Sequence, residues 1–294
     1  MNIPTLDSLV YWVALHSVPG LGPVTYRKLL MWGGDPKSIL LSSKRDLNSL
    51  PWLKEGLIKA ILKARAELEE KTRLLDRLYR QGVRVVTLQD EDYPQKLKEI
   101  KSSPVVIYIK GKYLKRDDKA VAIVGSTRPS EKGYRIAQES ARRLALKGYT
   151  IVSGYARGID TAAHIGALET GGRTIMAIPM GIEAFSWRRE FSPYVSKEEG
   201  YLILSESLPS LGWQTGAALS RNKLIASLSS AVFVVETDVR GGALHTFSFA
   251  QRHGRKTFVL RYRRPPTTAR GNELLLRQGG TPISNFKEVE EIMV

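Results

Sequence analysis

The middle of the chain contains Ala120-Val121-Ala122-Ile123-Val124-Gly125-Ser126, an unbroken apolar run that ends in a glycine and a serine. A second run of this kind, Thr150-Ile151-Val152-Ser153-Gly154, follows a stretch of helical character. Near-continuous apolar strands are typical of parallel sheets whose two faces are both covered by helices. The two runs therefore predict buried strands of an α/β fold.

From Val83 onward, short β-branched runs alternate with helical stretches, a pattern typical of βαβ units. We therefore predict a mostly parallel sheet with helices on both faces. The predicted strands are Val83–Leu88, Val105–Ile109, Ala120–Val124, Thr150–Val152, Thr174–Ile178, Tyr201–Leu204, Ala231–Val235 and Lys256–Leu260. The predicted helices are Lys132–Leu146, Ile159–Leu168, Ser220–Ala226, Gly242–Arg252 and a short one at Lys287–Ile292.

The first part of the chain has a different pattern, in which apolar residues recur at helical spacing. A long helix is predicted over Lys54–Arg80, with Gly82 at the position of a C-cap. A chain of 294 residues has the length of about two domains. We expect a small all-helical domain over residues 1–82 and the α/β domain over residues 83–294.

The charge balance indicates a polyanionic partner. Lys and Arg total 45 and Asp and Glu total 29, which gives a net charge of +16. The stretch from Gln251 to Gln278 contains a single acidic residue, Glu273, and a cluster of basic residues. These are Arg252, Arg255, Lys256, Arg261, Arg263, Arg264, Arg270 and Arg277. The alternative is a surface whose charge serves solubility alone.

Composition also excludes several kinds of chemistry. The chain has no cysteine, so disulfides, thiolate metal sites and thiol nucleophiles are ruled out. Its four histidines show no metal-ligand spacing, and no apolar run approaches the ~18 residues that cross a bilayer. We expect a soluble cytoplasmic protein with no metal, no cofactor and no membrane association.

Two glycines near the N-terminus resemble a helix-hairpin-helix module. Gly20 and Gly22 lie in the segment Leu15–Val24, between stretches of helical pattern. Such a hairpin presents backbone N–H groups to a phosphate without reading bases. A weaker second half is found at Asn48–Gly56. The alternative is a pair of helices that serves only packing or protein contact.

The loops after two predicted strands carry candidate phosphate ligands, at the sheet edge where open α/β sheets bind ligands and where helix N-termini favour anions. These residues are Gly125, Ser126, Arg128, Ser153, Gly154 and Arg157. Neither a Gly-x-Gly-x-x-Gly fingerprint nor a Gly-Lys-Ser/Thr loop is present. The loops therefore predict a phosphate site but not NAD binding or ATP hydrolysis.

Asp160 and His164 lie four residues apart at the start of a predicted helix and share one of its faces. They form a candidate acid–base pair. Asp160 is equally a candidate helix cap, and a lone histidine is commonly a structural partner.

A third group of candidates comes from later in the chain and comprises Arg221, Asn222, Lys223, Gly241 and Gly242. Together with the two earlier loops they are expected to meet at one edge of the sheet. That arrangement predicts a groove for a phosphodiester chain or a pocket for one nucleotide phosphate. The alternative is that these cations only solubilise loop ends.

Several blocks of the sequence together resemble the DNA-processing protein A family, also called DprA or Smf. They span most of residues 83–262 and occur in matching order. The blocks are Val124–Ser126, Ser153–Leu168, Gly171–Ile175, Arg221–Ser229, Val234–Glu236 and Gly242–Thr246, with Asp92–Leu97 and Pro104 before them.

The resemblance implies a Rossmann-like domain after a helix-hairpin-helix-like (SAM-like) domain, and a non-enzymatic binder of single-stranded DNA. Members of the family protect strands in natural transformation, load a RecA-type recombinase and form homodimers through the Rossmann-like domain. The positions implied to contact DNA are Gly125, Ser126, Ser153, Gly154, Arg157, Arg221, Asn222 and Lys223, with Gly241 and Gly242 nearby.

The chain departs from the family pattern at several places. Thr127 occupies a position that is usually Arg, and Arg128 follows it. Ala218-Leu219 replaces a Phe-Pro pair whose aromatic ring can stack on a base, and Trp213 and Trp187 are the candidate replacements. A Tyr-Pro pair is replaced within Gly181–Trp187, and no winged-helix domain is expected after the core. These changes indicate a divergent branch.

Two other functions stay open from the sequence alone. One is an enzyme that cleaves a nucleoside monophosphate, for which Glu236 before Gly241-Gly242 is the candidate acid. The other is a structural or scaffold protein whose positive charge is incidental.

Overall fold

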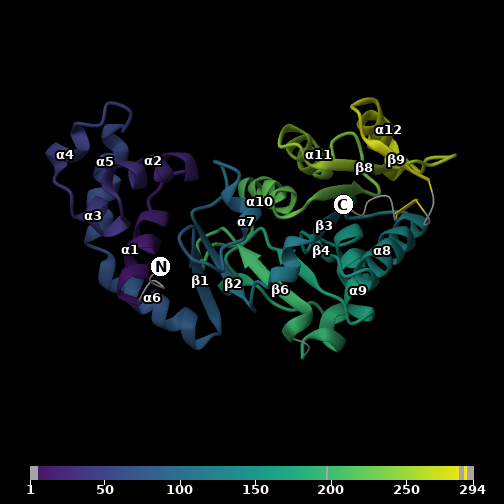
Figure 1. Cartoon of the computed structure of the whole chain (residues 1–294), viewed down its shortest axis with the longest axis horizontal. Coiled ribbons are helices and arrows are strands. Elements are labelled where there is room, and N and C mark those ends of the chain that lie inside the picture. The colour runs from purple at the N-terminus through teal and green to yellow at the C-terminus, as the bar shows by residue number, and fades with distance from the viewer. Residues whose placement is uncertain (1–5, 197, 285–287, 290–294) are drawn as a thin grey trace. The chain divides into compact units, whose positions relative to one another are not determined.

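The computed structural model describes residues 6–196, 198–284 and 288–289 (Figure 1). They form two compact units. One comprises the chain up to Tyr93 together with Lys101–Ile109, and the other comprises Pro94–Ile100 together with the chain from Lys110 onward. The predicted domain boundary after residue 82 stays a prediction, because compactness alone does not define a domain.

The first unit is mainly helical. Its helices are α1 (Leu6–His16), α2 (Pro23–Gly33), α3 (Pro36–Leu41), α4 (Lys44–Asn48), α5 (Glu55–Arg65) and α6 (Leu68–Arg80). They are followed by β1 (Val83–Thr87) and β2 (Val106–Lys110), which are hydrogen-bonded neighbours. Val10 and Val13 of α1 pack with Leu75 of α6 in a small core.

The prediction of one helix over Lys54–Arg80 was wrong, because the chain turns between α5 and α6. Both helices pack against α1. With 11 residues, α1 is only about 16 Å long, whereas a straight helix over residues 54–80 would extend about 40 Å. The turn after Arg65 lets both apolar faces reach the same partner.

The candidate hairpin lies between α1 and α2. Gly20 has φ +80°, a conformation that favours glycine, and Gly22 is the residue before the first turn of α2. The amide of Leu21 donates to the carbonyl oxygen of Val18 at 3.1 Å and closes the turn. Its resemblance to a DNA-binding hairpin stays a prediction.

The second unit is built on a parallel sheet. Its strands are β3 (Ala120–Val124), β4 (Thr150–Ser153), β5 (Thr174–Ala177), β6 (Tyr201–Ser205), β7 (Ala231–Val234), β8 (Lys256–Leu260) and β9 (Thr281–Ile283). They lie in the order β6-β5-β4-β3-β7-β8-β9, and every pair in this series is parallel. The central strand β3 is buried along its whole length, as its apolar sequence predicts.

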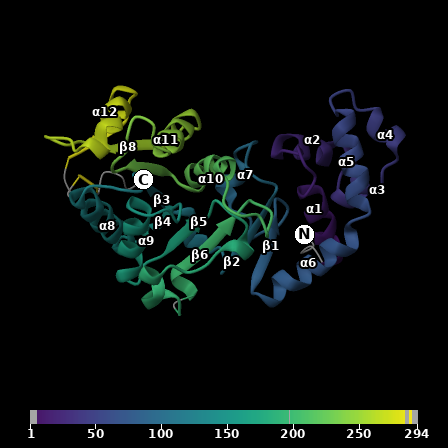
Figure 2. The same ribbon diagram turned by 180° about the vertical axis from the view of Figure 1, so that it is seen from behind.

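Helices cover both faces of this sheet. Figures 1 and 2 show α8 (Glu131–Leu146) and α9 (Ile159–Glu169) on one face and α10 (Thr215–Leu228) and α11 (Ala243–Arg252) on the other. A hydrophobic core joins side chains of α8 and α9 to alternate residues of β3, including Val121 and Ile123. The predicted α/β fold with a mostly parallel sheet and helices on both faces is confirmed.

Several short elements complete the second unit. They are α7 (Gln95–Lys98), α12 (Arg270–Arg277) and the 3₁₀ turns at Lys115–Asp118, Ile182–Ala184, Arg189–Tyr194, Glu198–Gly200 and Thr267–Ala269. The sequence analysis missed α7, α12 and β9, and the helix predicted at Lys287–Ile292 falls mostly outside the described residues. No helix in the described part of the chain has the length and apolar character needed to cross a membrane.

Candidate nucleic-acid interface

The loops after β3, β4 and β7 meet at the carboxyl edge of the sheet. The amide of Ser126 donates to the carbonyl oxygen of Glu236 at 2.6 Å, and the amide of Ile159 donates to the carbonyl oxygen of Ser126 at 3.1 Å. We call this edge the rim, defined by residues 125–130, 154–158 and 236–242 together with residues 221–223 of α10. The structure thus brings together the segments that the sequence analysis expected to converge.

Gly125 is required by this loop contact. A Cβ atom at this position would lie 2.6 Å from the carbonyl oxygen of Glu236 and 2.7 Å from the Ile159 side chain. Gly158, with φ +71°, leaves equally little space, because an added Cβ atom there would clash with the backbone of Ser126. The two glycines allow loops to touch one another, in addition to any ligand they admit.

Ser153 and Gly154 are buried, and their polar groups form hydrogen bonds within the protein. The hydroxyl of Ser153 donates to the carbonyl oxygen of Ile123 at 2.7 Å, and both residues are buried. The amide of Gly154 donates to Asp160 Oδ2 at 3.1 Å, and its carbonyl oxygen accepts from Arg221. Both polar groups of the Gly154 backbone are therefore occupied.

Arg221 is a buried link between α10 and two strand ends. Only 7% of its surface is exposed, and Nη1 donates to the carbonyl oxygens of Gly154 and, at 3.1 Å, of Ala177. The same nitrogen lies 3.8 Å from Asp160 Oδ2. The guanidinium holds the ends of β4 and β5 in place rather than facing solvent.

Asp160 holds the loop after β4. Its Oδ2 accepts from the amides of Gly154 and, at 3.3 Å, of Ala156. Burial raises the pKa of this carboxyl, and the charge of Arg221 opposes that rise. The candidate role of helix cap is not the one observed: the N-cap residue of α9 is Gly158, and Asp160 instead binds amides of the preceding loop.

His164 is a structural residue. Its ring is fully buried, Nδ1 lies 2.7 Å from the hydroxyl oxygen of Thr174, and Nε2 accepts from the amide of Tyr155 at 3.4 Å. Burial lowers the pKa of His164 to about 3, so the ring is neutral near pH 7. Asp160 and His164 therefore bind different partners instead of acting as an acid–base pair.

Three cations of the rim are exposed: Arg128, Arg157 and Lys223. Among the described residues none of them forms an ion pair. The neighbouring Asn222 donates from Nδ2 to the carbonyl oxygen of Gly242 at 3.2 Å, which connects α10 to the loop after β7. The loop after β8 adds Arg261, Arg263 and Arg264, all exposed at the same edge of the sheet.

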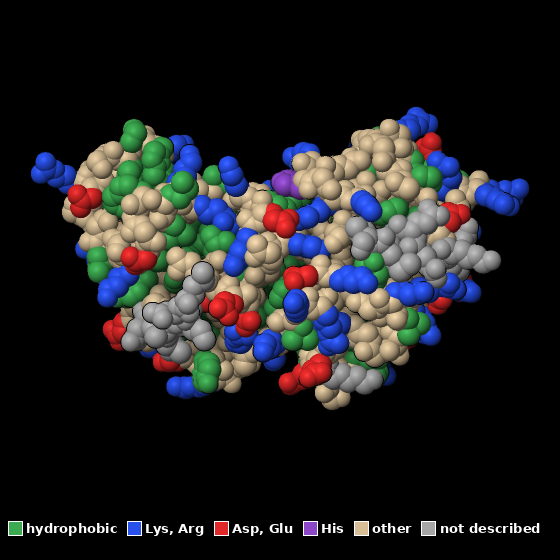
Figure 3. Space-filling view, viewed as in Figure 1, with side chains coloured by type: hydrophobic (Ala, Val, Ile, Leu, Met, Phe, Trp, Pro, Cys, Tyr) green, Lys and Arg blue, Asp and Glu red, His purple; other side chains and the backbone are tan. Residues whose placement is uncertain are grey.

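The cations of the rim lack ion-pair partners among the described residues, whereas several cations on the surface of α8 have them. Figure 3 shows blue side chains in a row over the part of the second unit that carries α8. Much of the basic charge on α8 is neutralised locally, since Arg142 pairs with Glu169 at 2.9 Å and Arg143 with Glu139 at 2.9 Å. Unpaired cations gather at the rim, which is the pattern that a polyanion needs.

Glu236 occupies the centre of the loop network and is fully buried. Its carboxylate accepts from the Ser130 amide and the Thr268 hydroxyl, each at 2.8 Å, and from the hydroxyls of Ser130 and Tyr262, each at 2.5 Å. Four donors occupy both oxygens. This carboxylate fixes the loop after β3 and the start of α8.

An aromatic cluster next to the rim was missed by the sequence analysis. Tyr155 has φ 59°, and its ring lies 4.9 Å from Phe185 and 5.3 Å from Phe191. The guanidinium of Arg188 lies 4.4 Å above the same ring. The only sequence signal was the position of Tyr155 inside the conspicuous Ser153–Leu168 block.

The two tryptophans considered as base platforms differ in environment. Trp187 packs edge-on against Phe185 and Tyr201, with ring centroids 5.1 and 4.8 Å away. Trp213 lies in the segment between β6 and α10 and is 62% exposed. Trp213 is therefore the one whose ring is available to a ligand.

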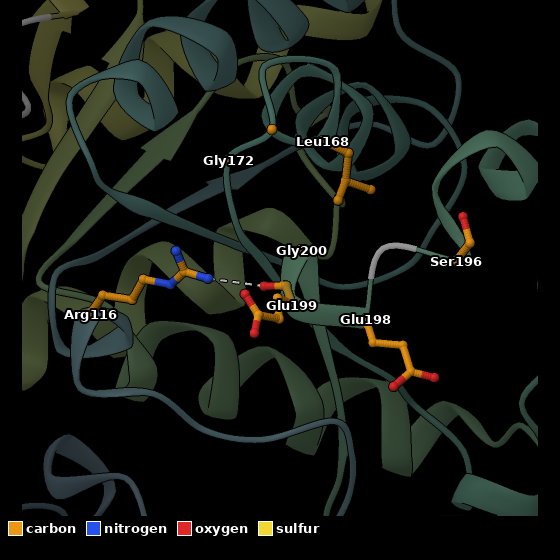
Figure 4. Close-up of a pocket in the computed structure, with 8 residues that line it drawn as sticks. Arg116, Leu168, Gly172, Ser196, Glu198, Glu199 and Gly200 are labelled. Atoms are coloured by element: carbon orange, nitrogen blue, oxygen red, sulfur yellow. Dashed lines mark hydrogen bonds between the residues drawn. The ribbon is translucent and has the colours of Figure 1, made fainter.

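A pocket of about 510 Å³ lies elsewhere, at the amino ends of β5 and β6 (Figure 4). Arg116 donates to the carbonyl oxygen of Glu199 at 3.1 Å beside it. Two carboxylates, Glu198 and Glu199, line it, so it does not suit a phosphate. Among the described residues no three His, Asp or Glu side chains are grouped as metal ligands.

The parallel sheet and its rim of glycine loops define a Rossmann-like α/β protein. Within that class, a family model for DNA recombination-mediator protein A matches residues 84–293. The chain belongs to this family. The resemblance inferred from the sequence blocks is confirmed.

Relatives with known names agree with this assignment. Protein Smf of Synechocystis is 32% identical over 256 residues, covering 85% of this chain and 64% of its own length. DNA processing protein DprA of Bacillus subtilis is 28% identical over 268 residues, covering 90% and 88%. The chain thus spans somewhat less than two thirds of the Synechocystis relative.

Two solved structures are similar to this one. DprA of Streptococcus pneumoniae superimposes with a TM-score of 0.77 at 26% identity, covering 100% of this chain and 99% of its own. DprA of Helicobacter pylori gives a TM-score of 0.61 at 29% identity over 71% and 95%. The latter structure was described for its single-stranded DNA binding mode. The similarity confirms the Rossmann-like fold.

Proposed function

We propose that this protein is a non-enzymatic recombination mediator that binds single-stranded DNA at the rim. The observation that carries the proposal is the meeting of three strand-end loops beside the exposed, unpaired cations Arg128, Arg157 and Lys223. A chain of backbone phosphates is the ligand that such a row of cations suits. The net charge of +16 and the single-stranded DNA binding of the Helicobacter pylori relative support it.

The rim residues divide into two roles under this proposal. The three exposed cations contact phosphates, and so does the hydroxyl of Ser126, which accepts from the Arg128 amide at 3.1 Å and keeps a hydrogen to donate. The remaining candidates shape the rim from beneath. They are Gly125, Ser153, Gly154, Arg221, Asn222, Gly241 and Gly242.

Trp213 supplies the base contact in this proposal. Proteins that bind single strands without sequence preference stack bases on exposed aromatic rings beside a basic track. Trp213 lies just before α10, the helix that carries Lys223, and its ring is exposed.

We also propose a wider biological role, which membership of the family supports. It comprises protection of incoming strands in natural transformation, loading of a RecA-type recombinase, dimerisation through the Rossmann-like domain and a cytoplasmic location. We propose these together with the division into a helix-hairpin-helix domain at residues 1–82 and a Rossmann-like domain at residues 83–294.

The burial and hydrogen bonding of Glu236 disfavour the alternative function, a nucleoside-monophosphate hydrolase with Glu236 as its catalytic acid. A catalytic acid has to reach the substrate. Both oxygens of Glu236 are buried and bind Ser130, Tyr262 and Thr268.

A titration of labelled oligo-dT and of duplex DNA at two salt concentrations tests the proposal. We expect preferential single-strand binding that weakens as salt rises. The triple variant Arg128→Ala, Arg157→Ala, Lys223→Ala is expected to lose most of this binding. The matched control removes three exposed lysines at the amino edge of the sheet, Lys112, Lys115 and Lys147. Equal binding of both DNA forms, or equal loss in both triple variants, overturns the proposal.

A further inference from the structure

The loop after β4 contains a backbone conformation that is rare for a tyrosine. Tyr155 has φ 59°, in the left-handed region, and among the described residues no other side chain than hydrogen is found at a positive φ. This conformation is costly for a bulky residue, so it persists only where surrounding contacts impose it. Arg157, two residues further on, is exposed and is one of the cations proposed to meet a phosphate.

The contacts that impose this conformation come from the segment between β5 and β6. The phenol hydroxyl of Tyr155 donates to the carbonyl oxygen of Ser186 at 3.0 Å and accepts from the amide of Arg188 at 2.9 Å. The ring of Phe191 is stacked 5.3 Å away, and the guanidinium of Arg188 lies 4.4 Å from the centroid of the Tyr155 ring. The buried side chain of Tyr155 is therefore held at its hydroxyl and on its ring.

The same segment also holds the backbone on one side of Arg157. Nη2 of Arg188 donates to the hydroxyl of Thr161 at 2.9 Å and to the carbonyl oxygen of Ala156 at 3.4 Å. The Thr161 hydroxyl donates to that same carbonyl oxygen at 2.8 Å. On the other side of Arg157, the amide of Ile159 donates to the loop after β3 at 3.1 Å. Arg157 thus lies between two fixed points of the backbone.

We infer that Tyr155 is a positioning residue for single-stranded DNA, whose hydrogen-bonded phenol holds the turn after β4 so that Arg157 is ordered at the rim before a strand binds. The inference rests on the proposed function, in which Arg157 contacts a phosphate. A cation on an ordered backbone loses less conformational entropy on binding, which raises affinity without a new contact. Without the phenol contacts the left-handed conformation of Tyr155 is no longer imposed, and binding itself has to order Arg157.

The test compares Tyr155→Phe with Tyr201→Phe. The matched control also removes a phenol that donates to a backbone carbonyl oxygen, that of Val195 at 2.9 Å, but Tyr201 begins β6 and so lies at the opposite edge of the sheet. Both variants keep the aromatic ring, and we expect similar decreases in their urea midpoints. Oligo-dT affinity, measured by fluorescence anisotropy, is expected to be roughly two- to tenfold lower in Tyr155→Phe than in Tyr201→Phe, the range of one lost hydrogen bond.

A double variant separates positioning from a merely structural role. Because the phenol acts through Arg157, Tyr155→Phe combined with Arg157→Ala is expected to bind oligo-dT as tightly as Arg157→Ala alone. Hydrogen exchange of the free protein tests the turn without DNA. Exchange at amides 155–158 is expected to be faster in Tyr155→Phe and unchanged in Tyr201→Phe.

Three results would overturn the inference. They are equal oligo-dT affinity of Tyr155→Phe and Tyr201→Phe, a loss that adds fully to that of Arg157→Ala, and unchanged exchange at amides 155–158. Failure of the proposed function gives a different result. In that case the unaltered protein does not bind oligo-dT, or Arg157→Ala binds it as tightly as the unaltered protein does.

Discussion

The guanidinium of Arg221 lies against the backbone of Gly154, 67 residues earlier in the chain, and donates to its carbonyl oxygen. The contact locks the end of β4 to α10. Arg221 and Lys223, two residues apart on α10, therefore have different environments: the first is buried and the second is exposed.

The first prediction separates these two cations. Lys223→Ala is expected to weaken oligo-dT binding several-fold and to reduce the slope of log affinity against log salt by about 0.7, the loss of one phosphate contact. Arg221→Ala is expected to lower the free energy of unfolding by about 3 kcal/mol, since it leaves Asp160 buried without its partner. Urea denaturation and salt titrations measure both. An Arg221→Ala protein of normal stability with a reduced salt slope would mean that Arg221 contacts DNA directly.

The second prediction concerns the contact between the loops after β3 and β7. Gly125→Ala places a Cβ atom 2.6 Å from the carbonyl oxygen of Glu236, so we expect a loss of about 1–3 kcal/mol of stability from overpacking. Gly216→Ala is the control, because no atom lies within 4 Å of its added Cβ and it sits in α10. The control is expected to gain about 0.5–1 kcal/mol from helix propensity. Urea unfolding measures the stability of both variants. Equal changes in the free energy of unfolding would contradict the close loop contact.

The third prediction follows from buried His164. Its pKa is about 3 in the folded protein and about 6.5 when unfolded, so the unfolded state binds the extra proton first as pH falls. Stability is therefore full above about pH 6.5 and declines towards pH 3, by about 2 kcal/mol from this residue at pH 5. Urea unfolding at pH 5, 6 and 7.5 measures the decline. His164→Gln is expected to flatten it, whereas exposed His245→Gln is expected to leave it unchanged, and identical profiles for both would refute this role of His164.

The fourth prediction tests Trp213 as a base platform. Trp213→Ala is expected to weaken oligo-dT binding by about 5- to 100-fold, the value of stacking one base on an aromatic ring. Trp213→Phe keeps a ring and is expected to retain most of the affinity. An abasic oligonucleotide carries the same phosphates, so its binding is expected to be equal in all three proteins. A loss of abasic binding in Trp213→Ala would show that the residue acts on the backbone or on folding instead.

Much of the fold could be predicted from local sequence. The strands around β3 are continuous apolar runs, and such runs are distinctive without any tertiary information. The sequence analysis missed β9 because it has three residues, one of them Pro282, and gains its pairing from β8. It missed the turn after Arg65 because helix propensity continues through Ala66 and Glu67, and packing on α1 decides the break.

The candidate site was predictable in position but not in detail. Parallel strands place their carboxyl ends at one edge, so the convergence of the loops followed from topology. The burial of Arg221 did not, because its partners Gly154 and Ala177 belong to other strands and are carbonyl groups, which every residue has. Side-chain type alone gave Arg221 and Lys223 the same expected role.

The bonds to Glu236 also set the shortest fragment that can keep the rim intact. Two of its four donors, Tyr262 and Thr268, lie beyond the end of β8, and Asn272 further on binds the carbonyl oxygens of Val235 and Leu260. A truncation directly after β8 keeps Arg128, Arg157 and Lys223 but removes the anchors that hold the loop after β3. Under the proposed function, a minimal fragment that binds DNA therefore has to extend past Asn272, although none of the residues proposed to contact phosphates lies in that extension.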